Sequence, residues 1–150
     1  MKRKILSILT FVLVAVCSAF LFIGCDKETN AGVKKATVLE KSEVLLVIRV
    51  DEIEGEPVLY DVLTFLQNEG EISFVCSDST YGKSLDAING KASEGTYYWA
   101  SYLSDETQAA GNSFSWNGNE YPYAMAGVSS LKVKEEGVYI FHYESWQTEA

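Results

Sequence analysis

The alternation of apolar and polar residues predicts several short strands in the region that follows residue 35. Both faces of the segment 44–50 are largely apolar, which is typical of a strand at the centre of a sheet. Residues 36–40 are interpreted as an earlier strand paired to it. Further strands are predicted at residues 72–76, 85–88, 96–103, 131–133 and 138–143, and an Asn-Gly turn at 89–90 ends the second of these.

A single helix is predicted between residues 57 and 70. Four apolar residues recur at the i, i+3, i+4 and i+7 spacing of an apolar stripe: Leu59, Val62, Leu63 and Leu66. Pro57 suits the first helical turn, and Gly70 can end the helix in a left-handed conformation. The acidic segment 51–56 before it is interpreted as a solvated turn, because it lacks the ligand spacing of a calcium loop. One strand pair, one helix and several later strands predict an α+β fold, with the helix across one face of a sheet.

The N-terminal segment has the pattern of an exported protein. Basic residues at 2–4 precede an uncharged, mostly apolar run over residues 5–24, and acidic residues begin at Asp26. A basic start, an apolar run and a small residue at the cleavage point describe an export signal. The cysteine that follows makes this segment resemble a bacterial lipoprotein signal. The resemblance implies a thioether-linked diacylglycerol on Cys25 and cleavage between Gly24 and Cys25.

The chain is therefore expected to contain a signal peptide at residues 1–24, a lipidated tether at 25–35 and one domain at 36–150. Two acyl chains bind a bilayer stably, so the anchor would hold the domain on the cell membrane, outside the cytoplasm. An uncleaved transmembrane helix is the alternative, since twenty apolar residues are long enough to span a bilayer. Either arrangement places the domain outside the cytoplasm.

The charge balance argues against nucleic acid as a partner. Lys and Arg number 12 against 21 Asp and Glu, a net charge of −9, and removal of the signal leaves −12. A surface this acidic repels phosphate backbones. Once Cys17 leaves with the signal and Cys25 is acylated, Cys76 is the remaining cysteine. Its alternation with apolar residues favours an inert, buried thiol over a nucleophile.

Several short motifs follow one another in a familiar order: Tyr60-Asp61-Val62-Leu63, Tyr81-Gly82, Ile88-Asn89-Gly90, Tyr98-Trp99, Gly127 and Gly137. Over residues 44–143 this order resembles a family of bacterial surface domains similar to the C-terminal domain of transcobalamin and intrinsic factor. The resemblance implies a β-grasp-like fold, a mixed sheet wrapped around one helix, after a cleaved signal peptide. In the vertebrate relatives this domain caps the upper face of cobalamin, so the resemblance also implies cobalamin as a ligand.

Aromatic residues gather in one part of the chain. Residues 97–123 hold eight of the 16 aromatic residues that follow Cys25, interleaved with Gly and Asn. Aromatic faces supply contact area and Asn supplies directional hydrogen bonds, a combination suited to sugars, peptides or a flat cofactor. The ligand-binding residues expected here are Trp99, Tyr102, Trp116, Tyr121 and Tyr123. The alternative is that Trp99 and its neighbours pack in the core and that 116–119 is merely a hairpin turn.

No catalytic set can be assembled around His142, the single histidine, so the sequence predicts no enzyme and no metal site. Packing of His142 among aromatic residues is favoured over ligation of a corrinoid cobalt. The predicted function is that of a membrane-anchored, non-catalytic module that binds a small molecule, a corrinoid or a cell-surface glycan. Docking to another surface protein is the alternative, and a cell-surface hydrolase is the third hypothesis. Membrane lipid is the partner expected through Cys25.

Overall fold

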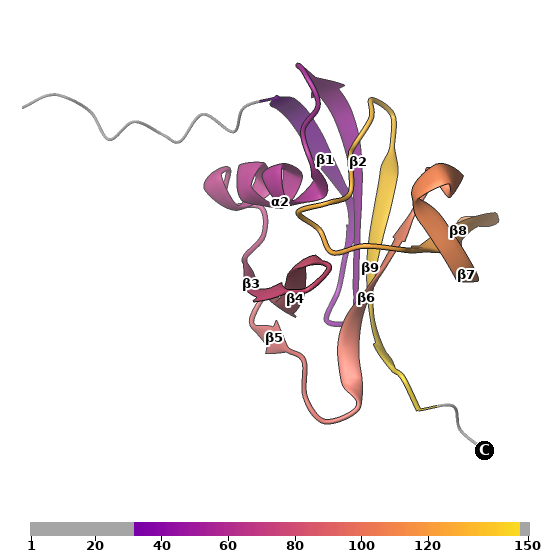
Figure 1. Cartoon of the computed structure of the whole chain (residues 1–150). Helices are drawn as coiled ribbons and strands as arrows, with labels where there is room; N and C mark the ends of the chain where they lie inside the picture. The colour runs from indigo at the N-terminus through magenta and orange to yellow at the C-terminus, as the bar shows by residue number, and fades with distance from the viewer. Residues whose placement is uncertain (1–31, 148–150) are drawn as a thin grey trace, which may run out of the picture.

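The computed structural model describes residues 32–147, so the expected signal peptide and Cys25 lie outside the described residues. The described chain contains one α-helix, α2 (Leu59–Asn68), and a short 3-10 helix, η1 (Glu106–Gln108). Its nine strands are β1 (Val33–Lys41), β2 (Leu45–Ile53), β3 (Phe74–Ser79), β4 (Gly82–Ile88), β5 (Lys91–Ala92), β6 (Tyr97–Leu103), β7 (Ala109–Trp116), β8 (Asn119–Ala124) and β9 (Val138–Ser145) (Figure 1). The described part is thus mostly β-sheet with one helix, in agreement with the predicted α+β class.

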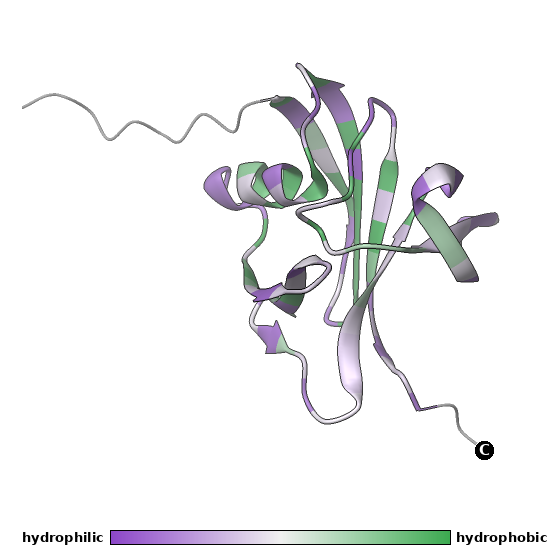
Figure 2. Ribbon diagram, in the orientation of Figure 1, coloured by the Kyte–Doolittle hydropathy of each residue, from purple (hydrophilic) through white to green (hydrophobic). Residues whose placement is uncertain are grey.

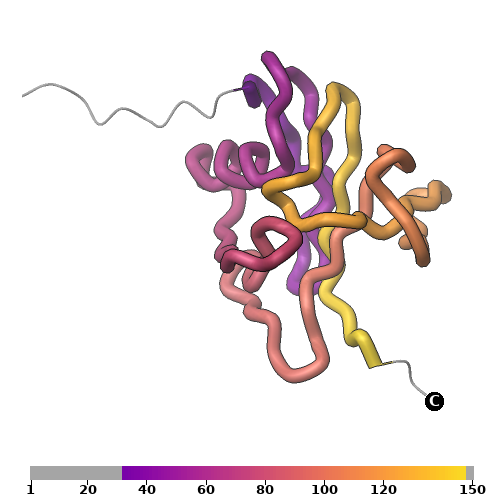
Figure 3. The backbone as a smooth tube through the Cα atoms, viewed as in Figure 1, coloured from indigo at the N-terminus to yellow at the C-terminus, as the bar shows by residue number. Residues whose placement is uncertain are grey.

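The strands form a six-stranded sheet in the order β1-β2-β9-β6-β8-β7 and a three-stranded sheet in the order β3-β4-β5. Every strand pair among the described residues is antiparallel, so the expectation of a mixed sheet is wrong. The reason is the path into β9. Figure 3 shows the segment 125–137 running from the β7–β8 hairpin toward the helix before it turns into β9. β9 begins beside the middle of β2, with Val138 opposite Arg49, and runs back along the first half of β2 until His142 lies opposite Leu45.

The apolar stripe of α2 is confirmed and contributes four residues to the main core. Leu59, Val62, Leu63 and Leu66 are all buried. They pack against the inner faces of β2 and β9, where Figure 2 shows apolar positions along both strands. Each fully buried aliphatic side chain contributes about 1.5 to 3 kcal/mol relative to an exposed one. The expectation of a central strand over 44–50 is also confirmed, since β2 has neighbours on both sides and is buried on both faces.

The helix begins at Leu59 and not at Pro57, which precedes the N-cap residue Val58. The backbone N–H of Val58 donates to the carboxylate of Asp61 over 2.9 Å. The N–H groups of the first turn donate to carbonyl oxygens in the segment 128–131. These bonds satisfy donors that a helix start leaves unpaired. The contact with the segment 128–131, rather than the proline, therefore determines where the helix begins.

The C-terminal end of the helix follows the prediction. Gly70 adopts a φ of +78°, its N–H donates to the carbonyl of Gln67, and the N–H of Glu71 donates to the carbonyl of Leu66. This pair of bonds is the Schellman motif, which needs a residue in the left-handed region. Two Asn-Gly turns have the same basis, and the second is the hairpin turn that the sequence offered as an alternative for residues 116–119. Residues 89–90 and 117–118 all have positive φ and form tight hairpin turns.

Several predicted boundaries are wrong. β1 begins at Val33, which is only 4% exposed, so residues 33–35 belong to the domain and not to the tether. β2 continues to Ile53, so only the second half of the acidic segment 51–56 is a turn. Residues 131–133 form no strand and make one isolated bridge at Lys132, because this segment is held against the start of the helix.

The β7–β8 hairpin crosses the face of the large sheet that lies opposite the helix (Figure 1). β1 and β7 are the two outermost strands in the sheet order, yet Trp116 Nε1 donates to Glu40 Oε2 over 2.8 Å. The sheet therefore curls until its two ends meet. A second, smaller core lies beneath the hairpin and contains Val47, Ala100, Tyr102, Tyr121 and Ile140.

Candidate functional site

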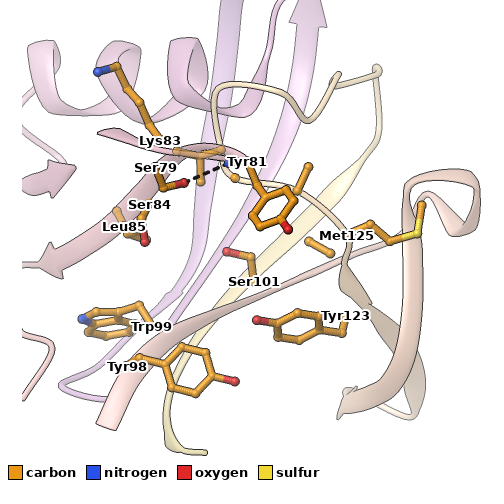
Figure 4. A pocket seen from close by; sticks show the side chains of 14 residues that line it. Ser79, Tyr81, Lys83, Ser84, Leu85, Tyr98, Trp99, Ser101, Tyr123 and Met125 are labelled. Atoms are coloured by element: carbon orange, nitrogen blue, oxygen red, sulfur yellow. Dashed lines mark hydrogen bonds between the residues drawn. The ribbon is translucent and has the colours of Figure 1, made fainter. Parts of the chain in front are cut away.

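An open cleft of about 250 Å³ lies between β4, the first half of β6 and the segment 123–128 (Figure 4). We call it the hydroxyl cleft. It exists because β6 pairs with β9 along its whole length but with β8 at a single residue pair, Tyr102 and Tyr123. Before that pair β6 and β8 diverge. In the described chain, no strand therefore pairs with the first half of β6 on the side away from β9. The three-stranded sheet and the segment 123–128 form the walls.

The wall formed by residues 125–129 is docked tightly on the start of β4. The N–H of Gly127 donates to the carbonyl of Tyr81 over 2.9 Å, and the N–H of Val128 donates to the carbonyl of Lys83 over 3.0 Å. The hydroxyl of Ser129 accepts from the N–H of Lys83 over 2.8 Å. A Cβ atom on Gly127 would lie 2.5 Å from the Lys83 carbonyl oxygen, so the close approach requires glycine.

The lining of the cleft is uncharged where it meets the open space. Figure 4 shows the side chains of Tyr81, Ser101 and Tyr123 pointing toward the same space, with the Lys83 side chain directed away from it. Lys83 Nζ instead lies 2.8 Å from an Asp78 carboxylate oxygen, and this ion pair raises the pKa of Lys83. Burial raises the pKa of the Tyr98 hydroxyl, so this lining group is protonated and uncharged at neutral pH.

Two large side chains at the mouth of the cleft are exposed to solvent. Tyr81 is 76% exposed and Met125 is 59% exposed. A small soluble domain usually buries side chains of this size, and exposed apolar groups at the rim of a cavity often mark a binding site. Sequence reasoning did not propose Tyr81, Ser101 or Met125 as ligand-binding residues. The available signals were the Tyr-Gly pair at the β3–β4 turn and the serine inside an aromatic strand.

The structure brings four of the five predicted binding residues together, but in the second core beneath the hairpin and not around the cleft. Tyr102 and Tyr121 are buried there, and Trp116 and Tyr123 pack against them. Trp99 belongs to the main core, and Trp99 and Tyr123 also line the cleft. Trp99 is only 5% exposed, and its Nε1 donates to the Lys91 carbonyl over 2.8 Å, so its main role is structural. The side chains at 99 and 102 diverge because successive residues of a strand point to opposite faces.

Tyr102 belongs to a polar cluster centred on Glu144. Its hydroxyl lies 2.8 and 2.9 Å from the two carboxylate oxygens of Glu144, and that of Tyr98 lies 3.3 Å away. His142 Nδ1 is 2.9 Å from the same carboxylate, and the ring of Phe114 lies 4.7 Å from the imidazole ring. Burial, followed by the contact with Glu144, raises the pKa of Tyr102. His142 therefore packs against the ring of Phe114, in line with the expected aromatic packing, and is also held by the carboxylate of Glu144.

The surroundings of Cys76 disfavour its reactive thiolate form. Cys76 is partly buried on β3 and packs against the main core. Burial, followed by the nearby Asp86 carboxylate, raises the pKa of the thiol to about 11. Because the thiolate is the reactive species, little of it is present at neutral pH.

Residues 32–147 contain no group of His, Cys, Asp and Glu side chains arranged to hold a metal ion. In the same part of the chain, no helix combines the length and the apolar character that crossing a bilayer requires. No protein-family model matches the chain, and no curated protein matches it either.

Proposed function

We propose that this protein is an exported lipoprotein, anchored through Cys25, whose domain binds a small neutral ligand in the hydroxyl cleft without catalysis. The export signal and the cysteine that follows it support the anchor. The cleft supports binding, because its uncharged hydroxyl groups converge on one space beneath an exposed apolar rim. This convergence is the observation that carries the proposal.

The cleft differs from the site expected from the sequence. The aromatic segment 97–123 was expected to carry recognition, but most of its aromatic side chains stabilise the curled sheet. Recognition is instead assigned to residues from three separate elements: Tyr81 between β3 and β4, Ser101 on β6, and Met125 after β8. The protonated thiol of Cys76 agrees with a role that involves no nucleophile.

A relation to the transcobalamin C-terminal domain remains part of the proposal. A β1–β2 hairpin followed by one helix packed across the sheet supports a β-grasp-like arrangement, although the described strand pairs are antiparallel and the sheet is not mixed. Under this relation the ligand is a corrinoid. A cleft of about 250 Å³ is smaller than typical sites for drug-sized ligands, so it would hold one edge of a corrinoid and leave the remainder outside.

The anchor is tested by replacing Cys25. Wild-type protein should fractionate with membranes and incorporate labelled palmitate, whereas the Cys25→Ser variant should lose the label. Unlabelled wild-type protein in the soluble cytosolic fraction would refute the export proposal.

Ligand binding is tested on the same preparation. Nuclear magnetic resonance of the full protein with a set of small neutral compounds should shift signals of Tyr81 and Ser101. The hairpin residue Ser115 lies outside the cleft lining and serves as the reference. Shifts in no lining residue with any compound would refute the binding role.

Docking to another surface protein is the second candidate, and exposed aromatic residues at the far end of the sheet favour it. Tyr97 and Trp146 are both exposed, and the N–H of Trp146 donates to the carbonyl of Thr96 beside Tyr97. This role predicts that lipidated protein retrieves a specific surface protein from membranes. The Tyr97→Ser variant should lose that partner while binding small ligands normally.

A further inference from the structure

The chemistry of the hydroxyl cleft indicates the class of its ligand, an inference that rests on the proposed function. We infer that the cleft binds a neutral sugar ring, one hexopyranose unit of a glycan. The charge of the lining, its hydrogen-bonding groups and the volume of the cleft each limit the class of ligand.

The charge of the lining argues against ionic ligands. No Asp or Glu lines the cleft among the described residues, and the nearby carboxylates already have partners: Asp78 pairs with Lys83, and Glu144 accepts from the hydroxyls of Tyr98 and Tyr102. Lys83, the one lining cation in that part of the chain, is paired with Asp78, and its Nζ lies 5.6 Å from the ring centre of Tyr60. Its side chain leads away from the open space (Figure 4). A charged ligand would lose hydration without compensation, because transfer of an unpaired charge from water is unfavourable.

Hydroxyl groups then favour a polyhydroxylated ligand. The side chains of Tyr81, Ser101 and Tyr123 come from three different elements and point toward one space. A hydroxyl both donates and accepts, so each can pair with a sugar hydroxyl in either direction. An acyl chain or a steroid would cover these groups and leave them unpaired, at a cost of about 1 to 3 kcal/mol for each group.

The rim and the size of the cleft favour a single ring. A pyranose has an apolar C–H face, and the exposed ring of Tyr81 and the side chain of Met125 offer apolar surface at the mouth. The volume of about 250 Å³ lies below the range of roughly 300 to 1,000 Å³ for drug-sized ligands. Because the cleft is open, the rest of a glycan can extend into solvent.

The test uses the full lipidated protein in lipid nanodiscs, which avoids detergents with sugar headgroups. Methyl glycosides of glucose, galactose, mannose and N-acetylglucosamine, and their neutral oligosaccharides, are titrated by calorimetry and tryptophan fluorescence. We expect saturable binding of at least one of them, with a Kd of about 1 mM for a single ring. Glucuronic acid and glucosamine should bind more weakly than their neutral counterparts.

Two variants place the sugar in the cleft. Ser101→Ala removes one hydroxyl from a partly exposed position and should weaken binding about three- to tenfold. Tyr81→Ala removes the exposed ring and should weaken binding at least as much. Ser115→Ala on the β7–β8 hairpin removes a hydroxyl outside the cleft lining and should leave the Kd unchanged.

Cyanocobalamin and uncharged aromatic fragments are titrated in parallel, which separates this inference from the proposed function. Binding of one of these, lost in Ser101→Ala, with no saturable binding of any neutral sugar, would overturn the sugar assignment and keep the binding role. Sugar binding that both cleft variants leave unchanged would also overturn the assignment. Binding of nothing in either set would overturn the sugar assignment and the ligand-binding role together.

Discussion

Replacing Gly127 with alanine tests whether the wall of the hydroxyl cleft is held as tightly as the structure indicates. The added Cβ would lie 2.5 Å from the Lys83 carbonyl oxygen and 3.0 Å from the Tyr81 carbonyl oxygen. Both obstacles are backbone atoms, so they cannot move aside by rotating a side chain. Either the start of β4 or the segment 125–129 must therefore shift.

The expected cost follows from what that shift breaks. Two backbone hydrogen bonds join the segments, from Gly127 to Tyr81 and from Val128 to Lys83. Each contributes about 0.5 to 1.5 kcal/mol, and inserting a methyl group into a packed site typically costs about 1 to 3 kcal/mol. Relaxation recovers part of the total. We therefore expect Gly127→Ala to lower the free energy of unfolding by about 2 to 4 kcal/mol.

Urea unfolding followed by tryptophan fluorescence measures this change. Gly95→Ala is the comparison variant, because Gly95 has a φ of +61° and its added Cβ would meet nothing within 4 Å. Its cost is the backbone penalty of a left-handed residue, about 1 kcal/mol. Gly127 has no positive φ, so the cost of Gly127→Ala comes from the close contact instead. If Gly127→Ala were no more destabilising than Gly95→Ala, the close approach of the two segments would be wrong.

Three further predictions concern other parts of the fold. Trp116→Phe removes the hydrogen bond to Glu40 that joins the two ends of the curled sheet, so the free energy of unfolding should fall by about 0.5 to 1 kcal/mol; an equal effect in a Glu40→Ala background would refute this coupling. Burial raises the pKa of Asp51, but hydrogen bonds from Thr37 and Arg49 outweigh it and hold the pKa below 3.8. Its contribution to stability should therefore be present above pH 3.8 and be lost as the pH falls through the lowered value, and Asp51→Asn should flatten this part of the stability profile. Peptide mass spectrometry at pH 7.5 should show alkylation of Cys76 about a hundredfold slower in native than in unfolded protein, because its thiol pKa is about 11 against 9.0; equal rates would contradict the burial of this thiol.

Features that depend on neighbouring residues were predictable from the sequence. The apolar stripe of the helix, its end at Gly70 and the Asn-Gly turn at 89–90 all formed as expected. Each depends on residues that lie within roughly ten positions of one another, where hydrophobic periodicity and backbone preference determine the local structure directly. The two-residue period of a strand also places Trp99 and Tyr102 on opposite faces, so their separation could have been read from the sequence.

Features that depend on contacts between distant residues were not predictable from the sequence. β7 reads Ala-Ala-Gly-Asn-Ser-Phe-Ser-Trp, in which Phe and Trp are the two large apolar residues. These two side chains pack against a second core that includes Val47 and Ile140, which are distant in sequence. The helix begins two residues after Pro57 because the carbonyls of the segment 128–131 accept its first N–H groups. In both places a contact across many residues overrode a local signal.

Local patterning by itself determined the helix, the tight turns and the buried central strand, and composition determined the acidic net charge. Tertiary structure alone decided the direction of β9, the curl of the sheet and the cleft. The cleft is built from residues near positions 81, 101 and 125, which lie about 20 residues apart in sequence. Their meeting depends on how β6 and β8 diverge and on the glycine at 127, and hydrophobic periodicity carries no information about either.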